Sequence, residues 1–139
     1  METAETILHT WMKRVWNQLD VGAMDELLAS DAPVHGLGPD PLVGPAGFAQ
    51  FHAAFTGGFD QIHIDVTQQV ANGDWVAARW SGTMTHRATG KAVAAEGMAI
   101  AVVHDGKIRQ SWNSADFLPL LIELGFVSAD AMERALKPQ

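Results

Sequence analysis

Apolar residues in the first part of the chain recur at helical spacing. Within residues 6–19, Ile7, Trp11 and Val15 lie four positions apart, which predicts an amphipathic helix. Asp20 is a preferred N-cap residue and predicts a second, short helix that runs to Leu28. Both helices would present an apolar surface to the rest of the fold.

A short strand is predicted at residues 32–37, followed by a third helix. Pro45 occupies a favourable first-turn position, and glycines at residues 57–58 end the helix. The apolar face of this helix consists of Phe48, Phe51, His52 and Phe55. The third helix therefore contributes an aromatic surface.

The second half of the chain alternates apolar and polar residues with a period of two, which is typical of strands. Four strands are predicted, at residues 62–70, 75–86, 92–104 and 107–114. The segments 72–74 and 105–106 are hairpin turns, and two more helices are predicted at 117–124 and 128–136. Helices followed by an antiparallel meander indicate an α+β fold, here one domain over residues 1–139. Long strands joined by tight turns must twist and curl, so the helices fill the open side of a curved sheet.

Composition narrows the function. The formal net charge of -7 argues against nucleic acid and membranes as partners, because both reward basic patches. The chain has no cysteine, and its acidic N-terminus lacks the layout of a signal peptide, so we expect a cytoplasmic protein without disulfides. It also has no H-E-x-x-H motif, and we expect neither a metal nor a cofactor. Five tryptophans must be buried or must line a cavity for a small apolar or aromatic ligand.

Asp116 is the strongest catalytic candidate. Trp112, Ser114 and Asp116 share one face of an extended segment, and the large apolar Trp112 predicts that this face points inward. A carboxylate in an apolar pocket is a stronger general base. The alternative is that Asp116 caps the helix that starts at Phe117, since aspartate is a preferred N-cap.

Glu96 interrupts an apolar strand and shares its alternating face with Met98 and Ile100. If this face points inward, Met98 and Ile100 line the pocket and Glu96 is an acid beside it. Acids are almost never fully buried unpaired. Two interpretations therefore stay open: Glu96 pairs with Arg79 or a histidine, or this part of the strand forms the pocket rim.

Two histidines and three tryptophans complete the candidate site. His35 lies in a short strand and is either a third catalytic group or a hydrogen-bonded structural histidine. His52 belongs to the aromatic helix face and would point into the same cavity. Trp16, Trp80 and Trp112 are the predicted aromatic walls, with plain core packing as the alternative.

Several short motifs occur in one order along nearly the whole chain. The first part carries Val15-Trp16-Asn17, Asp25-Glu26-Leu27-Leu28, Val34-His35-Gly36 and Gly44-Pro45-Ala46-Gly47-Phe48. The strands carry Arg79, Gly82-Thr83 and His86. The end carries Asp105-Gly106-Lys107-Ile108, Ser111-Trp112-Asn113, Asp116, Leu120-Leu121 and Leu124-Gly125. This series resembles the SnoaL-like polyketide cyclases.

The resemblance implies a nuclear-transport-factor-2-like cone, in which a curved antiparallel sheet wraps N-terminal helices around a pocket. It also implies that Asp116 is the acid/base group of a cofactor-free intramolecular aldol closure. The chain departs from the family on the strand of Glu96, where an assisting histidine is replaced by an apolar residue near Val102. A non-catalytic binding module, a ketosteroid isomerase-like reaction and an epoxide hydrolase-like reaction therefore remain alternatives.

The outer face of the sheet predicts a second partner. Trp75 and Trp80 have opposite parity on one strand, so both cannot face the cone. An exposed apolar sheet face is an aggregation hazard that a second copy would cover. We therefore expect a homodimer.

Overall fold

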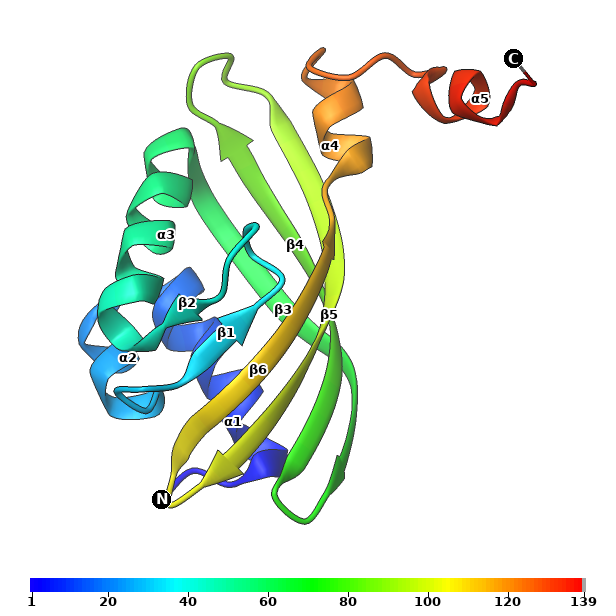
Figure 1. The fold of residues 1–139 in the computed structure, drawn as a ribbon. Coiled ribbons are helices and arrows are strands. Elements are labelled where there is room, and N and C mark those ends of the chain that lie inside the picture. The colour runs from blue at the N-terminus through cyan, green and yellow to red at the C-terminus, as the bar shows by residue number, and fades with distance from the viewer. Residues whose placement is uncertain (139) are drawn as a thin grey trace.

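The computed structural model describes residues 1–138 and has six strands in one curved, unclosed sheet (Figure 1). The helical elements are α1 (Ala4–Trp11), a π-helical turn η1 (Met12–Asn17), α2 (Gly22–Leu27), α3 (Gly44–Gly58), α4 (Leu118–Glu123) and α5 (Ala131–Leu136). The strands are β1 (Pro33–His35), β2 (Leu42–Val43), β3 (Phe59–Asn72), β4 (Trp75–His86), β5 (Ala92–His104) and β6 (Lys107–Asp116). The predicted α+β fold is confirmed.

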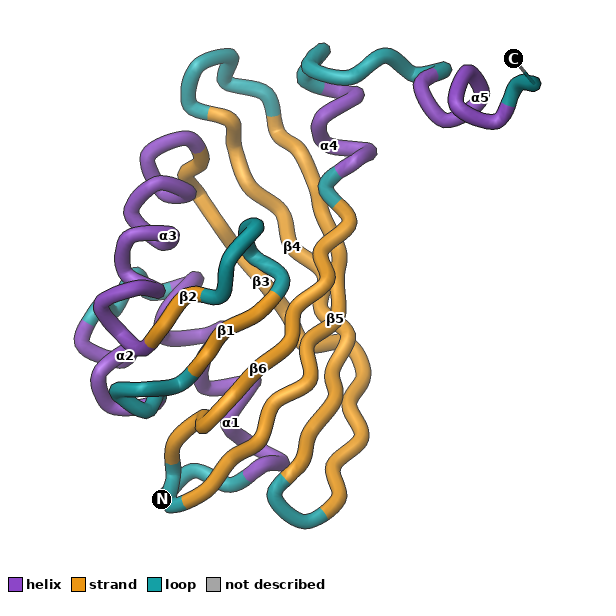
Figure 2. Tube along the Cα trace, in the orientation of Figure 1, coloured by secondary structure: helices purple, strands orange, loops and turns teal. Residues whose placement is uncertain are grey.

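The strands follow the order β2-β1-β6-β5-β4-β3, and neighbours are antiparallel except for the parallel pair β1 and β6. Figure 2 shows the four long strands as one curved layer, with α1, α2 and α3 on its concave side. The four predicted strands are present. The two-residue β2, which covers the edge beside β1, was not predicted because it is too short for alternation to show.

The first predicted helix is present as α1 followed by η1, and its apolar stripe is buried as expected. Ile7 and Val15 have no exposed surface. Asn17 ties the end of η1 to β3, because its Nδ2 donates to the Ile64 carbonyl at 2.9 Å and its Oδ1 accepts from the Ile64 N–H at 2.7 Å. This pair of bonds sets the position of the helix against the sheet.

Small residues occupy the inner face of β5, and this overturns the predicted parity of that strand. The buried inner positions include Ala95, Ala99 and Ala101, which let the N-terminal helices approach the sheet closely. A Cβ on Gly97 would lie 2.6 Å from the Trp80 ring and 2.6 Å from the Ser114 carbonyl oxygen. The strand therefore needs small residues inside, although the larger ones had been predicted there.

The larger residues of the same strands face outward instead. Glu96, Met98 and Ile100 are exposed, so the prediction that they line the cone is wrong. Trp112 and Asp116 on β6 are also exposed on the outer face, opposite Ile100 and Glu96 respectively. The apolar character of Trp112 was a misleading guide because this sheet has two apolar faces.

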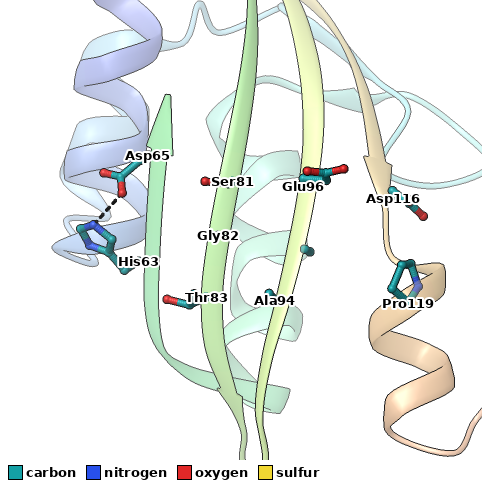
Figure 3. Close-up of a pocket in the computed structure, with 10 residues that line it drawn as sticks. His63, Asp65, Ser81, Gly82, Thr83, Ala94, Glu96, Asp116 and Pro119 are labelled. Atoms are coloured by element: carbon teal, nitrogen blue, oxygen red, sulfur yellow. Dashed lines mark ion pairs between the residues drawn. The ribbon is translucent and has the colours of Figure 1, made fainter. Parts of the chain in front are cut away.

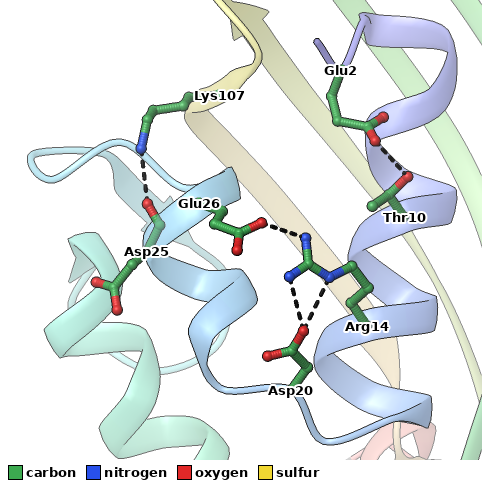
Figure 4. A network of polar contacts seen from close by, with 7 residues as sticks. All are labelled: Glu2, Thr10, Arg14, Asp20, Asp25, Glu26 and Lys107. Carbon is green, nitrogen blue, oxygen red and sulfur yellow. Dashed lines mark hydrogen bonds and ion pairs between the residues drawn. The ribbon is translucent and has the colours of Figure 1, made fainter.

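An ion-pair network joins the N-terminal helices (Figure 4). The Arg14 guanidinium contacts Asp20 Oδ2 at 2.8 Å and Glu26 Oε2 at 2.6 Å. The hydrogen bonds from Arg14 hold the pKa of both Asp20 and Glu26 below their ordinary values. The network thus links η1, the turn after it and α2.

Replacement of Arg14 by methionine should lower the free energy of unfolding at about pH 7, and this loss should shrink as the pH falls through the lowered folded-state pKa values of Asp20 and Glu26. The folded-state pKa values of Asp20 and Glu26 are lowered. Their contribution is therefore present above the ordinary carboxyl values and disappears as the pH falls through the folded ones. Urea unfolding across this range measures the difference between variant and wild type.

The matched control is Arg109→Met, because Arg109 donates to the His104 carbonyl oxygen and a carbonyl does not titrate. Its effect should be the same at every pH. A difference for Arg14→Met that persists unchanged at the acid end would contradict the network's assigned role.

Candidate functional site

An apolar cavity of about 70 Å³ lies between the helices and the inner face of the sheet. Its aromatic wall consists of Trp11, Trp16, Phe48, Phe51, Phe55, Trp80 and Phe117. Met12, Leu37, Ile64 and Met84 add apolar side chains. The predicted positions of Trp16 and Trp80 agree with this wall.

Trp16 is the centre of the aromatic wall. Its ring makes edge-to-face contacts with Phe48, Phe51 and Phe55, with centroids 6.1, 6.3 and 5.3 Å away. The ring centroids of His52 and Trp16 are 4.8 Å apart. The Nε2 atom of His52 lies 2.9 Å from the Val15 carbonyl oxygen. His52 is 5% exposed and is absent from the cavity wall, so it supports Trp16 instead of facing a ligand.

The cavity wall contains no titratable side chain, and its polar residues are Asn113 and Ser114, of which Ser114 is exposed on the outer face of the sheet. Asn113 Nδ2 donates to the His35 carbonyl oxygen at 3.0 Å and to Ser111 Oγ at 3.4 Å. These bonds fix the orientation of the amide and leave Oδ1 as its acceptor. Sequence reasoning missed Asn113, because the inverted parity of β6 had placed it outside.

The size of the cavity limits what it can hold. Pockets for drug-sized ligands usually measure about 300–1,000 Å³, several times more than this one. The closed cavity therefore suits a single small ring, and a larger flat molecule would require the aromatic side chains to move apart.

A second, open hollow of about 340 Å³ lies on the outer face of the sheet (Figure 3). A row of polar residues crosses it on four adjacent strands, in the order Asp65, Ser81, Glu96 and Asp116. We call this hollow the outer groove. His63 lies beside Asp65, with Nε2 3.2 Å from Oδ2, and both side chains are exposed.

The structure brings two of the three predicted catalytic residues together in the outer groove. Glu96 and Asp116 are directly opposite each other on antiparallel strands. Asp116 Oδ1 also accepts from the N–H of Leu118, the first residue of α4, at 3.3 Å, although the N-cap position itself is held by Phe117. Both interpretations of Asp116 therefore keep a structural basis, although its carboxylate points away from the cone.

His35, the third predicted catalytic residue, lies in a different part of the outer face. Its ring stacks on Trp112 with centroids 5.6 Å apart, and Trp112 in turn stacks on Trp75 at 5.9 Å. His35 Nε2 is 3.0 Å from Gln110 Nε2. The three rings form an aromatic row across the outer face.

Within residues 1–138, no group of three or more histidine or acidic side chains is arranged to hold a metal ion. No helix in the same part of the chain is both long and apolar enough to cross a membrane.

A curved sheet wrapped around N-terminal helices, with an apolar cavity between them, defines the nuclear-transport-factor-2-like class of folds. The model of the SnoaL-like polyketide cyclase family matches residues 6–124. The chain belongs to this family. A search of curated proteins finds no match.

Solved structures agree on the fold. IdmH of Streptomyces antibioticus, a proposed polyketide cyclase, has a TM-score of 0.80 at 23% identity, over 89% of this chain and 99% of its own. A proposed polyketide cyclase of Acidithiobacillus ferrooxidans reaches 0.79 at 24% identity, over 88% and 94%. AclR of Streptomyces galilaeus, a proposed hydroxylase, reaches 0.77 at 24% identity, over 91% and 99%. Family and fold together support a cyclase-type function.

Replacement of Gly97 by alanine should push the Trp80 ring toward the cavity, because the new methyl group would lie 2.6 Å from it. Overpacking of this kind costs about 1–3 kcal/mol of stability. Urea unfolding measures the loss, and a shifted tryptophan emission maximum reports the movement. Gly57→Ala is the control, since no atom lies within 4 Å of its Cβ position and alanine favours a helix by about 1 kcal/mol. Equal stability of the two variants would contradict this view of the wall.

Proposed function

We propose that the protein encloses a small, flat, uncharged compound in the cone. The observation that carries this proposal is the cavity wall, in which seven aromatic side chains meet and no titratable group is present. A charged ligand would lose its hydration there without gaining a partner. An uncharged ring gains aromatic contacts and can donate one hydrogen bond to Asn113 Oδ1.

The ligand proposal is tested by thermal shift with benzene and phenol as probes, because the cavity of about 70 Å³ suits a single ring. Both should raise the midpoint of unfolding, and the anionic analogue benzoate should not. The Gly97→Ala variant should lose the response, because the displaced Trp80 occupies the space. Equal shifts with benzoate, or a full response in the variant, would refute binding in the cone.

We further propose that the compound carries carbonyl groups and that Asp116 acts on it without a cofactor. Asp116 would take a proton from a C–H between two carbonyls, the enolate carbon would attack a second carbonyl carbon, and the resulting alkoxide would take the proton back. Such a C–H is already acidic, so a modest general base suffices. This is an intramolecular aldol closure, as the family resemblance implies.

The position of Asp116 in the chain supports this chemistry, although its present orientation does not complete it. Its neighbours Ala115 and Phe117 both line the cavity, so Asp116 lies at the rim. Its carboxylate lies in the outer groove beside Glu96. The proposal therefore requires the junction between β6 and α4 to turn when a ligand binds.

A non-catalytic binding module is the second candidate. It is favoured by the cavity wall itself, which offers no acid or base. Isomerase-like and epoxide hydrolase-like reactions are less well supported, because the family model that matches the chain is that of the polyketide cyclases.

Two substitutions of Asp116 separate these functions. If Asp116 is the base, Asp116→Asn should lower turnover of a β-dicarbonyl ester by ~10²–10⁴ with little change in stability. If Asp116 only caps α4, Asn should be nearly neutral, and Asp116→Ala should cost about 1 kcal/mol without loss of turnover. Turnover and thermal midpoints of both variants decide the question. Full turnover in the Asn variant would leave the binding module as the function.

We also propose that two copies pair through the outer face of the sheet. Trp75 is 51%, Met98 52%, Ile100 42% and Trp112 36% exposed, and a contiguous apolar patch of this kind marks an association surface. A symmetric dimer would cover the same patch on both copies.

Replacement of Ile100 by glutamate should weaken the dimer by about tenfold or more, because it places a charge at the centre of the interface. Sedimentation equilibrium at micromolar concentration measures the dissociation constant. Val43→Glu is the control, since Val43 is 56% exposed on β2, away from this patch. A wild-type protein that sediments only as a 15.0 kDa species would rule out the dimer.

A further inference from the structure

The C-terminal arm, which we define as residues 126–138, has little support from the rest of the chain beyond an edge-to-face contact of the Phe126 ring with His86 at 6.1 Å and backbone hydrogen bonds to Leu121. Figure 1 shows α5 standing apart from the body of the fold, and α5 has no buried residue. Phe126 is 69%, Met132 61% and Leu136 77% exposed. An arm with this much apolar surface lacks a partner in the single chain.

The short length of α5 makes the missing partner more significant. Isolated helices shorter than about 12–15 residues are marginal in water, and α5 has six. Its side-chain hydrogen bonds are those of Arg134, which donates to Asp130 Oδ1 at 3.2 Å and to Ser128 Oγ at 2.7 Å. Such exposed contacts contribute little, so α5 needs a packing surface.

The position of the arm indicates where that surface lies. In Figure 1, α4 and α5 leave the body on the side of the sheet opposite α1, α2 and α3, which is the side of the exposed outer face. Among residues 1–138, nine of the thirteen exposed large apolar side chains lie on the outer face or after β6. They are Val70, Trp75, Met98, Ile100, Trp112, Leu118, Phe126, Met132 and Leu136. Two uncovered apolar surfaces of one chain thus lie on one side of the molecule.

The outer groove is acidic, and the C-terminal arm carries Asp130 and Glu133 as well as Arg134 and Lys137. The outer groove carries Asp65, Glu96 and Asp116, and within residues 1–138 none of them forms an ion pair with a lysine or arginine. On α5, Met132 and Leu136 are four residues apart and share one face. Lys137 follows Leu136 directly. A helix that lays this face on the sheet would bring a cation to the acidic groove.

We propose that α5 docks on the outer face of a second copy of this chain, with Met132 and Leu136 on the apolar patch and Lys137 toward the outer groove. A second copy is the fitting partner because one symmetric association buries both surfaces of both chains at once. The inference rests on the dimer proposed above. It adds a contact in which the C-terminal arm of each chain packs on the outer face of the other.

The first test uses the full chain with Met132→Glu and Leu136→Glu together. Sedimentation equilibrium should give a dimer at least about tenfold weaker than wild type, because two charges replace the apolar contact. Val21→Glu is the matched control, since Val21 is 62% exposed on the helical side, and its dimer should be unchanged. Circular dichroism checks that β-sheet content is retained. If the double variant loses structure, Met132→Gln with Leu136→Gln replaces it.

The second test asks where the arm lies and exploits the absence of cysteine in the chain. Leu136→Cys and Ser114→Cys are made as separate proteins, mixed and treated with a short bismaleimide. A cross-link between the two different proteins is expected, and Val21→Cys mixed with Ser114→Cys should give none. Equal dissociation constants for wild type and the glutamate variant, or a missing cross-link in a dimeric protein, would contradict docking of α5 on the second copy. Neither result would contradict the dimer itself. A monomeric wild type would overturn both.

Discussion

The inner face of β5 has to be built from small residues, and the rest of the structure depends on this constraint. The N-terminal helices pack against a sheet that curves toward them, and Trp80 lies directly on the Gly97 backbone. No larger side chain fits between them. The cone can therefore be lined with aromatic rings from α1, η1 and α3, while Glu96, Met98 and Ile100 of β5 lie on the outer side.

This division gives the two faces of the sheet different properties. Inside, the wall is apolar, uncharged and closely packed, with Asn113 as an oriented acceptor. Outside, an acidic groove adjoins an aromatic row in which Trp112 lies between His35 and Trp75. Glu96 and Asp116, the carboxylates that the sequence pattern places inside the cone, lie on the opposite side of the sheet.

Much of the fold could be predicted from the sequence, because helical and strand periodicities are local properties. The boundaries of β4 and β5 and the buried stripe of Ile7 and Val15 follow from pattern alone. Which face of a strand points toward the helices does not follow from the pattern. When both faces are apolar, as on β5, alternation shows two sets of residues and gives no sign of which set the helices cover.

The error in the candidate site has the same physical origin. The sequence predicts that the large apolar Trp112 faces inward. Because the structure places Trp112 on the outer face, the residues that share its face also lie outside: Glu96, Met98, Ile100 and Asp116. The requirement for small residues inside is a three-dimensional one, since it comes from the Trp80 ring lying across Gly97. The aromatic positions of Trp16 and Trp80 were predictable because a helix face and a strand of small residues both limit the choice.

Asn17 has a consequence beyond the placement of a helix. β3 is an edge strand, and the outward N–H and C=O of Ile64 would otherwise be free to pair with a strand of another molecule. The single amide group of Asn17 occupies both of them, as one residue of a neighbouring strand would. Asn17 thus occupies backbone groups near the middle of β3 that another strand would otherwise bind. The side chain that positions η1 therefore also hinders the addition of a strand from another molecule.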